Sequence, residues 1–220
     1  MRLTLFDLDH TLLDGDSDTL WCDFLIGRGI LERQSFAARN ADLEKRYKAG
    51  TVGVDEFANF YVGTLAGRSP QEWELLRLEF LHVMILPRIG CAAVDLVKRH
   101  QNCGDLVLMT TATNRFITEL TARHFGIEHL IATEPQLEQE CFTGRTVGTL
   151  NMREGKVTRL HAWLAHAGRS LTEFDSTAYS DSINDLPLLQ AVRHPVAVNP
   201  DERLLAEAQS QGWTVMHLPH

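Results

Sequence analysis

The chain has 220 residues, 44% of them hydrophobic and 23% charged, which is typical of a soluble globular protein with one large domain or a core domain plus a smaller insertion. Its formal net charge of −8 argues against nucleic acid as a partner, because binding to a phosphate backbone relies on clustered lysine and arginine. No run of residues is apolar enough for a membrane span or a signal peptide, and the 4 cysteines are dispersed without a C-x-x-C pair, so we expect a cytoplasmic protein with free thiols and no membrane partner.

The first predicted element is a short buried strand, Leu3 to Phe6, which ends at two acidic residues, Asp7 and Asp9. Ligands of open α/β sheets sit beyond the carboxyl ends of the strands, and side chains two residues apart in an extended chain point the same way. Two such carboxylates repel each other unless one is protonated or a cation lies between them. The pair therefore indicates a hard metal ion and a nucleophile; the alternative is a strand-ending turn, since Asp and Thr favour turns.

The next part of the chain, to about Met84, is helical in character and contains no convincing strand. Ser17 or Asp18 is a plausible N-cap for the first helix, and Pro70 falls in the first turn of another, where its missing N–H costs nothing. The expected helices cover residues 19–28, 31–49, 55–65 and 70–82, with breaks at 50–53 and 67–70.

This helical region predicts a cap domain inserted after the first strand. We expect the cap to cover residues 15–85 and the core domain to consist of residues 1–14 and 86–220. Trp21, Tyr61 and Trp73 are expected to pack inside the cap rather than to form a platform for a substrate.

From Pro87 onward helices and strands alternate, which predicts parallel strands joined by right-handed crossovers. The expected helices are 89–100, 114–125, 157–167, 186–191 and 203–211, and the expected strands are 105–109, 130–133, 177–180, 195–198 and 213–217. Residues 136–150 are expected to form a two-stranded excursion around a turn at 143–145.

Three later segments carry polar clusters in positions like that of Asp7 and Asp9. In residues 109–114, hydroxyls and free backbone N–H groups precede a helix N-terminus, which can bind phosphate oxygens. Either Thr110 or Thr111 could supply the hydroxyl, and we prefer Thr111 because Thr110 continues the apolar strand.

The other two clusters offer a cation and further carboxylates. Lys156 opens a helix after a glycine and could place a point charge on a phosphate. Asp181 and Asp185 follow another apolar strand and could complete an oxygen-rich site of the kind magnesium prefers. Each cluster alone could be a helix cap, a solvated lysine or a turn, but one site at one edge of one sheet explains all of them together.

The pattern Asp7-x-Asp9-x-Thr11, Thr111, Lys156 and Asp181-x-x-x-Asp185 resembles the motifs of the haloacid dehalogenase superfamily of phosphohydrolases. The helical insertion is similar to the cap of the phosphoserine phosphatase-like branch, subfamily IB. Dehalogenases proper lack the second aspartate of the first motif, so Asp9 favours phosphate chemistry. The resemblance implies an α/β fold: a three-layer, Rossmann-like core with a parallel sheet and an inserted all-helical cap.

The resemblance also implies a mechanism that depends on Mg²⁺. The metal site would be formed by the carboxylates of Asp7 and Asp181 and the backbone carbonyl of Asp9. Asp185 would act through a water molecule or by contacting the residues that bind the ion. Asp7 would be the nucleophile that becomes an aspartyl-phosphate, and Asp9 the general acid and base. The residues that would hold the transferring phosphate are Thr111, the N–H of Ala112, Lys156 and, in addition, Asn184.

The substrate implied is a small phosphorylated metabolite. Asp16 stands nine residues after the nucleophile, where phosphoserine phosphatases have a glutamate that recognises an amine, and Asp14 and Asp18 make the same stretch acidic. This acidic stretch could favour an amine-bearing phosphomonoester, such as phosphoserine or histidinol phosphate, although an acidic turn with a helix cap explains these residues equally well. Histidinol phosphate, phosphoserine, phosphoethanolamine and a lipid phosphate are all open as substrates at this point. Candidates for a cap arginine that binds a carboxylate are Arg39, Arg46 and Arg68, each of which could simply be solvated.

Two other functions remain open at this point. A receiver-like module that accepts a phosphoryl group without hydrolysing it also uses an acidic cluster, a threonine and a lysine, but receivers are shorter and lack the inserted helices and the second aspartate. A phosphomutase of the same superfamily is the other alternative. The chain is expected to be a monomer or a homodimer.

Overall fold

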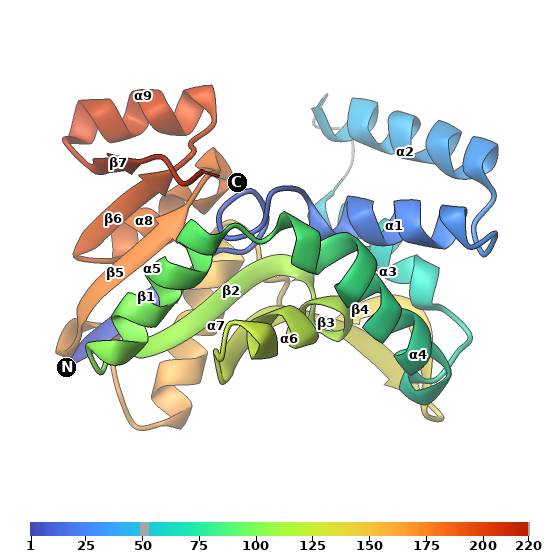
Figure 1. Ribbon diagram of the computed structural model, residues 1–220, viewed down its shortest axis with the longest axis horizontal. Helices are drawn as coiled ribbons and strands as arrows, with labels where there is room; N and C mark the ends of the chain where they lie inside the picture. The colour runs from blue at the N-terminus through green and yellow to red at the C-terminus, as the bar shows by residue number, and fades with distance from the viewer. Residues whose placement is uncertain (49–52, 220) are drawn as a thin grey trace.

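The computed structural model of the protein describes residues 1–48 and 53–219. Over these residues a seven-stranded sheet has the order β4-β3-β2-β1-β5-β6-β7 (Figure 1). The strands are β1 (Arg2–Phe6), β2 (Leu106–Asn114), β3 (His129–Glu138), β4 (Cys141–Val147), β5 (Asp175–Ser180), β6 (His194–Val198) and β7 (Thr214–Met216). All neighbouring strands pair in parallel except β3 and β4. The predicted α/β fold with a largely parallel sheet is confirmed.

The α-helices among the described residues are α1 (Ser17–Gly27), α2 (Arg33–Lys48), α3 (Val54–Val62), α4 (Pro70–Phe80), α5 (Cys91–Asn102), α6 (Arg115–His124), α7 (Glu154–His166), α8 (Leu186–Ala191) and α9 (Glu202–Gln211). A π-helical turn, Leu81–Ile85, continues α4 toward the core. Residues 49–52, which include most of the predicted break at 50–53, lie outside the described residues.

Strand β1 alternates its side chains between two hydrophobic cores. Leu3 and Leu5 pack with residues of α7, α8 and α9, whereas Phe6 packs with residues of α5 and α6. The sheet therefore forms the middle of three layers. Its central strand β1 lies between β2 and β5, where the strand order reverses, and a ligand site is expected at the carboxyl end of such a strand.

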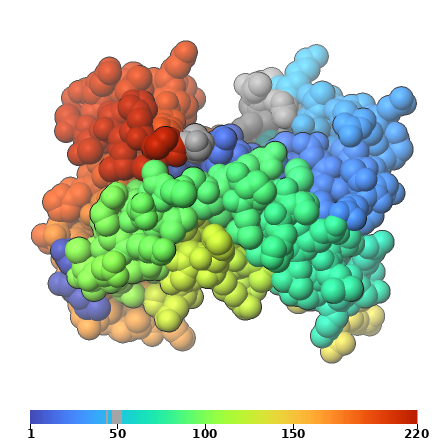
Figure 2. Space-filling view, viewed as in Figure 1, coloured from blue at the N-terminus to red at the C-terminus, as the bar shows by residue number. Residues whose placement is uncertain are grey.

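Helices α1 and α4 of the predicted cap share the core of the α5 and α6 face. Trp21 and Trp73 are each 1% exposed and pack edge to face, and Tyr61 is also buried. Trp21 donates a hydrogen bond to Thr64, and Trp73 donates one to the carbonyl of Leu65. The prediction that these residues pack inside the cap is confirmed for Trp21 and Trp73, whereas Tyr61 is buried but also lines a pocket next to Asp7 and Asp9. Figure 2 shows the C-terminal elements (red) and α2 (blue) standing apart at the upper edge of the molecule.

The structure corrects two local predictions. The turn of the β3–β4 hairpin is at Gln139 and Glu140, which have φ of 49° and 65°, and not at 143–145. Gly144 lies inside β4, where an added Cβ would be 2.9 Å from the Cβ of Ala66, so this glycine allows the cap to approach the hairpin closely. The N-cap of α1 is Asp16, whose carboxylate accepts from the N–H of Thr19, and not Ser17 or Asp18.

Within the described part of the chain, no single helix has the length and apolar character needed to cross a membrane. Two helical segments that meet at 96°, Pro70–Arg88 and Cys91–Asn102, are together long and apolar enough for a span, but only by length and composition.

Candidate active site

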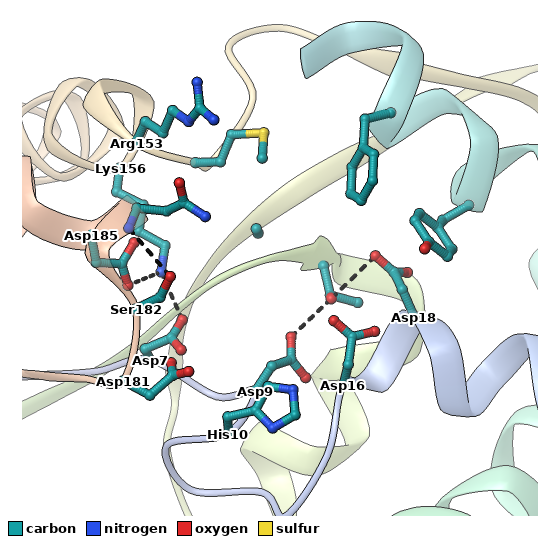
Figure 3. Close-up of a pocket in the computed structure, with 16 residues that line it drawn as sticks. Asp7, Asp9, His10, Asp16, Asp18, Arg153, Lys156, Asp181, Ser182 and Asp185 are labelled. Atoms are coloured by element: carbon teal, nitrogen blue, oxygen red, sulfur yellow. Dashed lines mark hydrogen bonds and ion pairs between the residues drawn. The ribbon is translucent and has the colours of Figure 1, made fainter. Parts of the chain in front are cut away.

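The carboxyl ends of β1, β2 and β5 and the start of α7 meet around one pocket. Figure 3 shows Asp7, Asp181, Asp185, Ser182 and Lys156 on one side and Asp9, His10, Asp16 and Asp18 on the other. The pocket is lined by Asp7, Asp9, His10, Asp16, Asp18, Phe57, Tyr61, Ala112, Thr113, Met152, Arg153, Lys156, Asp181, Ser182, Asn184 and Asp185. The residues predicted to bind metal or phosphate or to carry out catalysis all belong to this lining except Thr111.

Lys156 is the centre of a buried charge cluster. Its Nζ lies 2.7 Å from Oδ1 of Asp7 and 2.6 Å from Oδ2 of Asp185, and its side chain is 3% exposed. Burial alone would lower the pKa of Lys156, but the carboxylates of Asp185 and Asp7 raise it above its ordinary value. The lysine therefore stays charged and presents a fixed cation at the base of the pocket. Asp185 is held in place by a second donor, the Ser180 hydroxyl at 2.7 Å.

Thr11 connects the two carboxylates expected to bind metal. Its Oγ1 lies 3.2 Å from Oδ2 of Asp7 and 3.2 Å from Oδ1 of Asp181, and it also accepts the N–H of Asp181. Burial raises the pKa of Asp7 to about 6 against the opposing charge of Lys156, with a smaller contribution from Asp185. Burial together with the charges of Asp7 and Asp185 raises the pKa of Asp181 to about 8. Ionised carboxylates in this arrangement need a cation in addition to Lys156.

The residues present fit a magnesium ion. Among the described residues no group of three or more His, Cys, Asp or Glu side chains is arranged to hold a metal ion. Magnesium, however, usually keeps several waters and takes only one or two protein carboxylates, which the pair Asp7 and Asp181 can supply. Asp185 faces Lys156 and Ser180 instead, a position from which it would support the lysine rather than bind the ion directly.

Asp9 is held by donors from two directions. Its Oδ1 accepts the N–H of Ser17 at 2.8 Å, and its Oδ2 lies 3.0 Å from the hydroxyl of Thr113 and 3.4 Å from that of Thr111. The chain turns directly after Asp9, where His10 has φ of 54°. Burial, followed by the charges of Asp16 and Asp7, raises the pKa of Asp9 to about 7. A carboxyl group in this state can give and take a proton near neutral pH.

The two candidate threonines of β2 face different partners. Thr110 accepts a hydrogen bond from the side-chain amide of Asn151 at 3.0 Å, whereas the hydroxyl of Thr111 is directed at Asp9 and accepts the N–H of Thr113. Asn151 also donates to the carbonyls of Thr111 and Ile131. This buried amide, which fixes the ends of β2 and β3, was not identified from the sequence, because a lone Asn in a loop gives no signal of burial.

The entrance of the pocket is acidic on one side and aromatic on the other. Asp16 and Asp18 come from the start of α1, and Phe57 and Tyr61 come from α3. The predicted cap arginines Arg39, Arg46 and Arg68 are not part of the lining; they lie over Phe60, next to Asp42 and Glu56, and over Trp73, respectively.

Arg153 is the arginine that does line the pocket, and sequence reasoning missed it. It lies three residues before Lys156 and has φ of 50° and ψ of −127°, a conformation that L residues rarely adopt. The only sequence signal was its place next to the predicted Gly155–Lys156 helix start.

A family model described as haloacid dehalogenase-like hydrolase matches residues 4–190. The chain is 40% identical over 218 residues to a histidinol-phosphatase of Neisseria meningitidis, with 98% of both chains covered. It is 31% identical over 218 residues to a phosphoserine phosphatase of Mycobacterium tuberculosis, covering 96% of this chain and 68% of that relative.

Among solved structures, a protein of unknown function from Bordetella pertussis has a TM-score of 0.93 at 47% identity, covering 98% of this chain and 97% of that one. A substrate-bound phosphoserine phosphatase has a TM-score of 0.69 at 17% identity, over 98% of this chain and 92% of that one, which is a likeness of fold alone.

Proposed function

Because the chain belongs to the haloacid dehalogenase-like hydrolase family, we propose that it hydrolyses a small phosphomonoester with Mg²⁺ and through an aspartyl-phosphate on Asp7. The membership confirms the resemblance found in the motifs, and the chain is a phosphatase of this family. The observation that carries the proposal is the position of the Asp7 carboxylate, which is held in the pocket between Lys156 and Thr11 with Asp9 two residues away.

In the first step Asp7 attacks phosphorus in line with the leaving oxygen, so that its new bond to phosphorus forms as the ester bond breaks. Lys156 and the N–H of Ala112 hold the transferring oxygens, and Asn184 lies at the same pocket. Thr111 lies behind this lining, with its hydroxyl directed at Asp9. Asp9 donates its proton to the leaving oxygen, which its raised pKa permits.

In the second step Asp9 acts as a base. It removes a proton from a water molecule that attacks the phosphorus of the aspartyl-phosphate, which restores the Asp7 carboxylate and releases phosphate. Asp7 and Asp181, with the backbone carbonyl of Asp9, would hold Mg²⁺. When bound, the ion neutralises the negative charge that the carboxylates and the phosphate bring together.

The substrate we propose is an amine-bearing ester, with histidinol phosphate ahead of phosphoserine. A relative that is 40% identical over nearly the whole of both chains is named a histidinol-phosphatase. Asp16 gives the entrance a negative charge that attracts an amine and repels the carboxylate of phosphoserine, and Phe57 and Tyr61 offer flat surfaces to an imidazole. Phosphoserine stays as the second candidate because Arg153 lines the pocket and could meet a carboxylate.

The test is steady-state hydrolysis of histidinol phosphate, phosphoserine and an amine-free ester with and without Mg²⁺, read as phosphate release. We expect many turnovers that require Mg²⁺ and the highest kcat/KM for histidinol phosphate. A single stoichiometric phosphorylation of the protein would support the receiver-like alternative, and return of the phosphoryl group to another position of the substrate would support a phosphomutase.

A further inference from the structure

The hydroxyl of Thr113 lies between two carboxyl groups. Its Oγ1 is 3.0 Å from Oδ2 of Asp9 and 3.3 Å from Oδ2 of Asp18; the dashed lines of Figure 3 end on these two acids. A hydroxyl has a single proton to donate. It can therefore donate to only one of the two carboxyl groups, and the other must either be protonated and donate to Thr113 or face its lone pairs with a negative charge.

The surroundings identify Asp18 as the protonated partner. Its Oδ1 is buried and makes no hydrogen bond to any residue that the structure describes, whereas Oδ1 of Asp9 accepts the N–H of Ser17. A buried anionic oxygen without a donor is much more costly than a neutral one. In agreement with this, burial and the charges of Asp16 and Asp9 raise the pKa of Asp18 well above its ordinary value.

We propose that Asp18 and Thr113 are positioning residues for the acid/base carboxyl group of Asp9: the neutral Asp18 donates to the Thr113 hydroxyl, which is thereby oriented to donate to Asp9. The inference rests on the proposed function, in which Asp9 protonates the leaving group. With Ser17 holding one oxygen of Asp9 and Thr113 the other, the carboxyl group cannot rotate away from the ester. Asp18 belongs to cap helix α1 and Thr113 to core strand β2, so this chain of hydrogen bonds crosses from cap to core.

The test uses the dependence of the reaction on the leaving group. p-Nitrophenyl phosphate releases a good leaving group that needs no proton, whereas histidinol phosphate and glycerol 2-phosphate are aliphatic esters, with and without an amine, that need one. Because kcat/KM reports only the steps up to departure of the leaving group, it isolates the proton donation from the later hydrolysis of the aspartyl-phosphate.

We expect Thr113→Val to lower kcat/KM for both aliphatic esters by about 10- to 100-fold and for p-nitrophenyl phosphate by less than about 3-fold. Thr113→Ser, which keeps the hydroxyl, should restore most of the aliphatic rate. Asp18→Leu should lower the aliphatic-to-aryl ratio by about 3- to 10-fold, whereas Asp18→Asn should retain most of it because the amide N–H can still donate to Thr113. Asp23→Asn, at an exposed acid of the same helix, is the matched control.

The proposal is wrong if the ratio of kcat/KM for the aliphatic esters to kcat/KM for p-nitrophenyl phosphate is unchanged in the Thr113→Val and Asp18→Leu proteins. If Asp18→Leu lowers kcat/KM for histidinol phosphate alone, Asp18 binds the amine of the substrate instead. If Asp18→Asn is as impaired as Asp18→Leu, Asp18 does not act as a neutral hydrogen-bond donor to Thr113. Thermal unfolding of each variant separates misfolding from misplacement of Asp9. If the unmodified protein turns over none of the esters, the proposed function fails, rather than the role of Thr113.

Discussion

Lys156 and Asp7 are 149 positions apart in the sequence and form a buried ion pair with 2.7 Å between Nζ and Oδ1. Asp185 contacts the same ammonium at 2.6 Å, so one buried cation faces two buried carboxylates. Such a cluster contributes little net stability, because each ion has lost its water, but removing one partner leaves an uncompensated charge. The cluster therefore holds Asp7 in place, and removal of one of its charged groups should lower the stability of the fold strongly.

Lys156→Met should therefore reduce both stability and activity. We expect a loss of about 3–5 kcal/mol in the free energy of unfolding, measured with urea in the absence of metal, and loss of turnover. The double variant Lys156→Met/Asp185→Asn removes one of the two stranded charges and should recover part of the stability without recovering activity. Full stability of the single variant would contradict the buried ion cluster.

Asp7→Asn and Asp9→Asn should block different steps of the reaction. Without the Asp7 carboxylate no phosphoenzyme can form, so turnover should be abolished, and retained activity would remove the nucleophile assignment. Asp9→Asn should lower kcat by about 10²- to 10⁴-fold, because proton transfer is lost, while Mg²⁺ affinity changes little. Rapid-quench detection of the phosphoenzyme and calorimetric titration with Mg²⁺ separate these two effects, and an unchanged kcat for Asp9→Asn would contradict its acid/base role.

Stabilisation by Mg²⁺ should increase with pH. The folded-state pKa values of Asp7 and Asp181, about 6 and about 8, lie above the ordinary 3.8, so the metal-free protein keeps protons that the unfolded chain releases. The stability associated with these groups is present at low pH and is lost as the pH rises toward 8. Mg²⁺ replaces those protons, so its effect should be larger at about pH 8 than at about pH 5.5.

The measurement for this pH dependence is the shift in Tm on adding Mg²⁺. At 100-fold excess over Kd and about pH 8 we expect roughly 5–10 °C, which corresponds to about 2.7 kcal/mol. Asp181→Asn should reduce the shift at both pH values. An equal or larger shift at the lower pH would show that these carboxylates do not bind the ion.

The parts of the site that sequence predicted share one property. Asp7 and Asp181 directly follow β1 and β5, and Thr111 lies in the last half of β2. The carboxyl ends of parallel strands meet at one edge of the sheet regardless of the cap. Strand alternation and strand-end chemistry are local signals, so the convergence of these residues could be predicted without coordinates.

The parts that were missed depend on contacts between distant segments. Asn151 is buried because β2 and β3 present their threonines and carbonyls to it. Gly144 was predicted to lie in a turn, but the cap contact with Ala66 is what requires a glycine there. Neither contact leaves a periodic pattern in the sequence, and the same is true of the approach of Thr113 to Asp18.

Asp16→Asn separates the charge of the entrance from the capping of α1. Asn caps a helix as well as Asp does, so the hydrogen bond to the N–H of Thr19 should remain and Tm should change little. If Asp16 attracts an amine, kcat/KM for histidinol phosphate should fall by about 10-fold, whereas the value for glycerol 2-phosphate should not fall. Asp16→Ala should lower kcat/KM similarly and also cost about 1 kcal/mol of stability. A preference for amines that survives both variants would exclude Asp16 from substrate recognition.

Gly155→Ala should displace Lys156 without touching its charge. A Cβ at position 155 would lie 2.0 Å from the carbonyl oxygen of Leu150, a contact with backbone that cannot be relieved by rotating a side chain. The start of α7 must therefore move, and with it the ammonium that contacts Asp7 and Asp185. We expect a loss of at least about 2 kcal/mol in stability and at least about 100-fold in kcat/KM. Gly27→Ala is the matched control, because nothing lies within 4 Å of a Cβ there and alanine favours the helix that Gly27 ends. Wild-type kcat/KM for Gly155→Ala would mean that the position of Lys156 does not depend on the close approach of this loop.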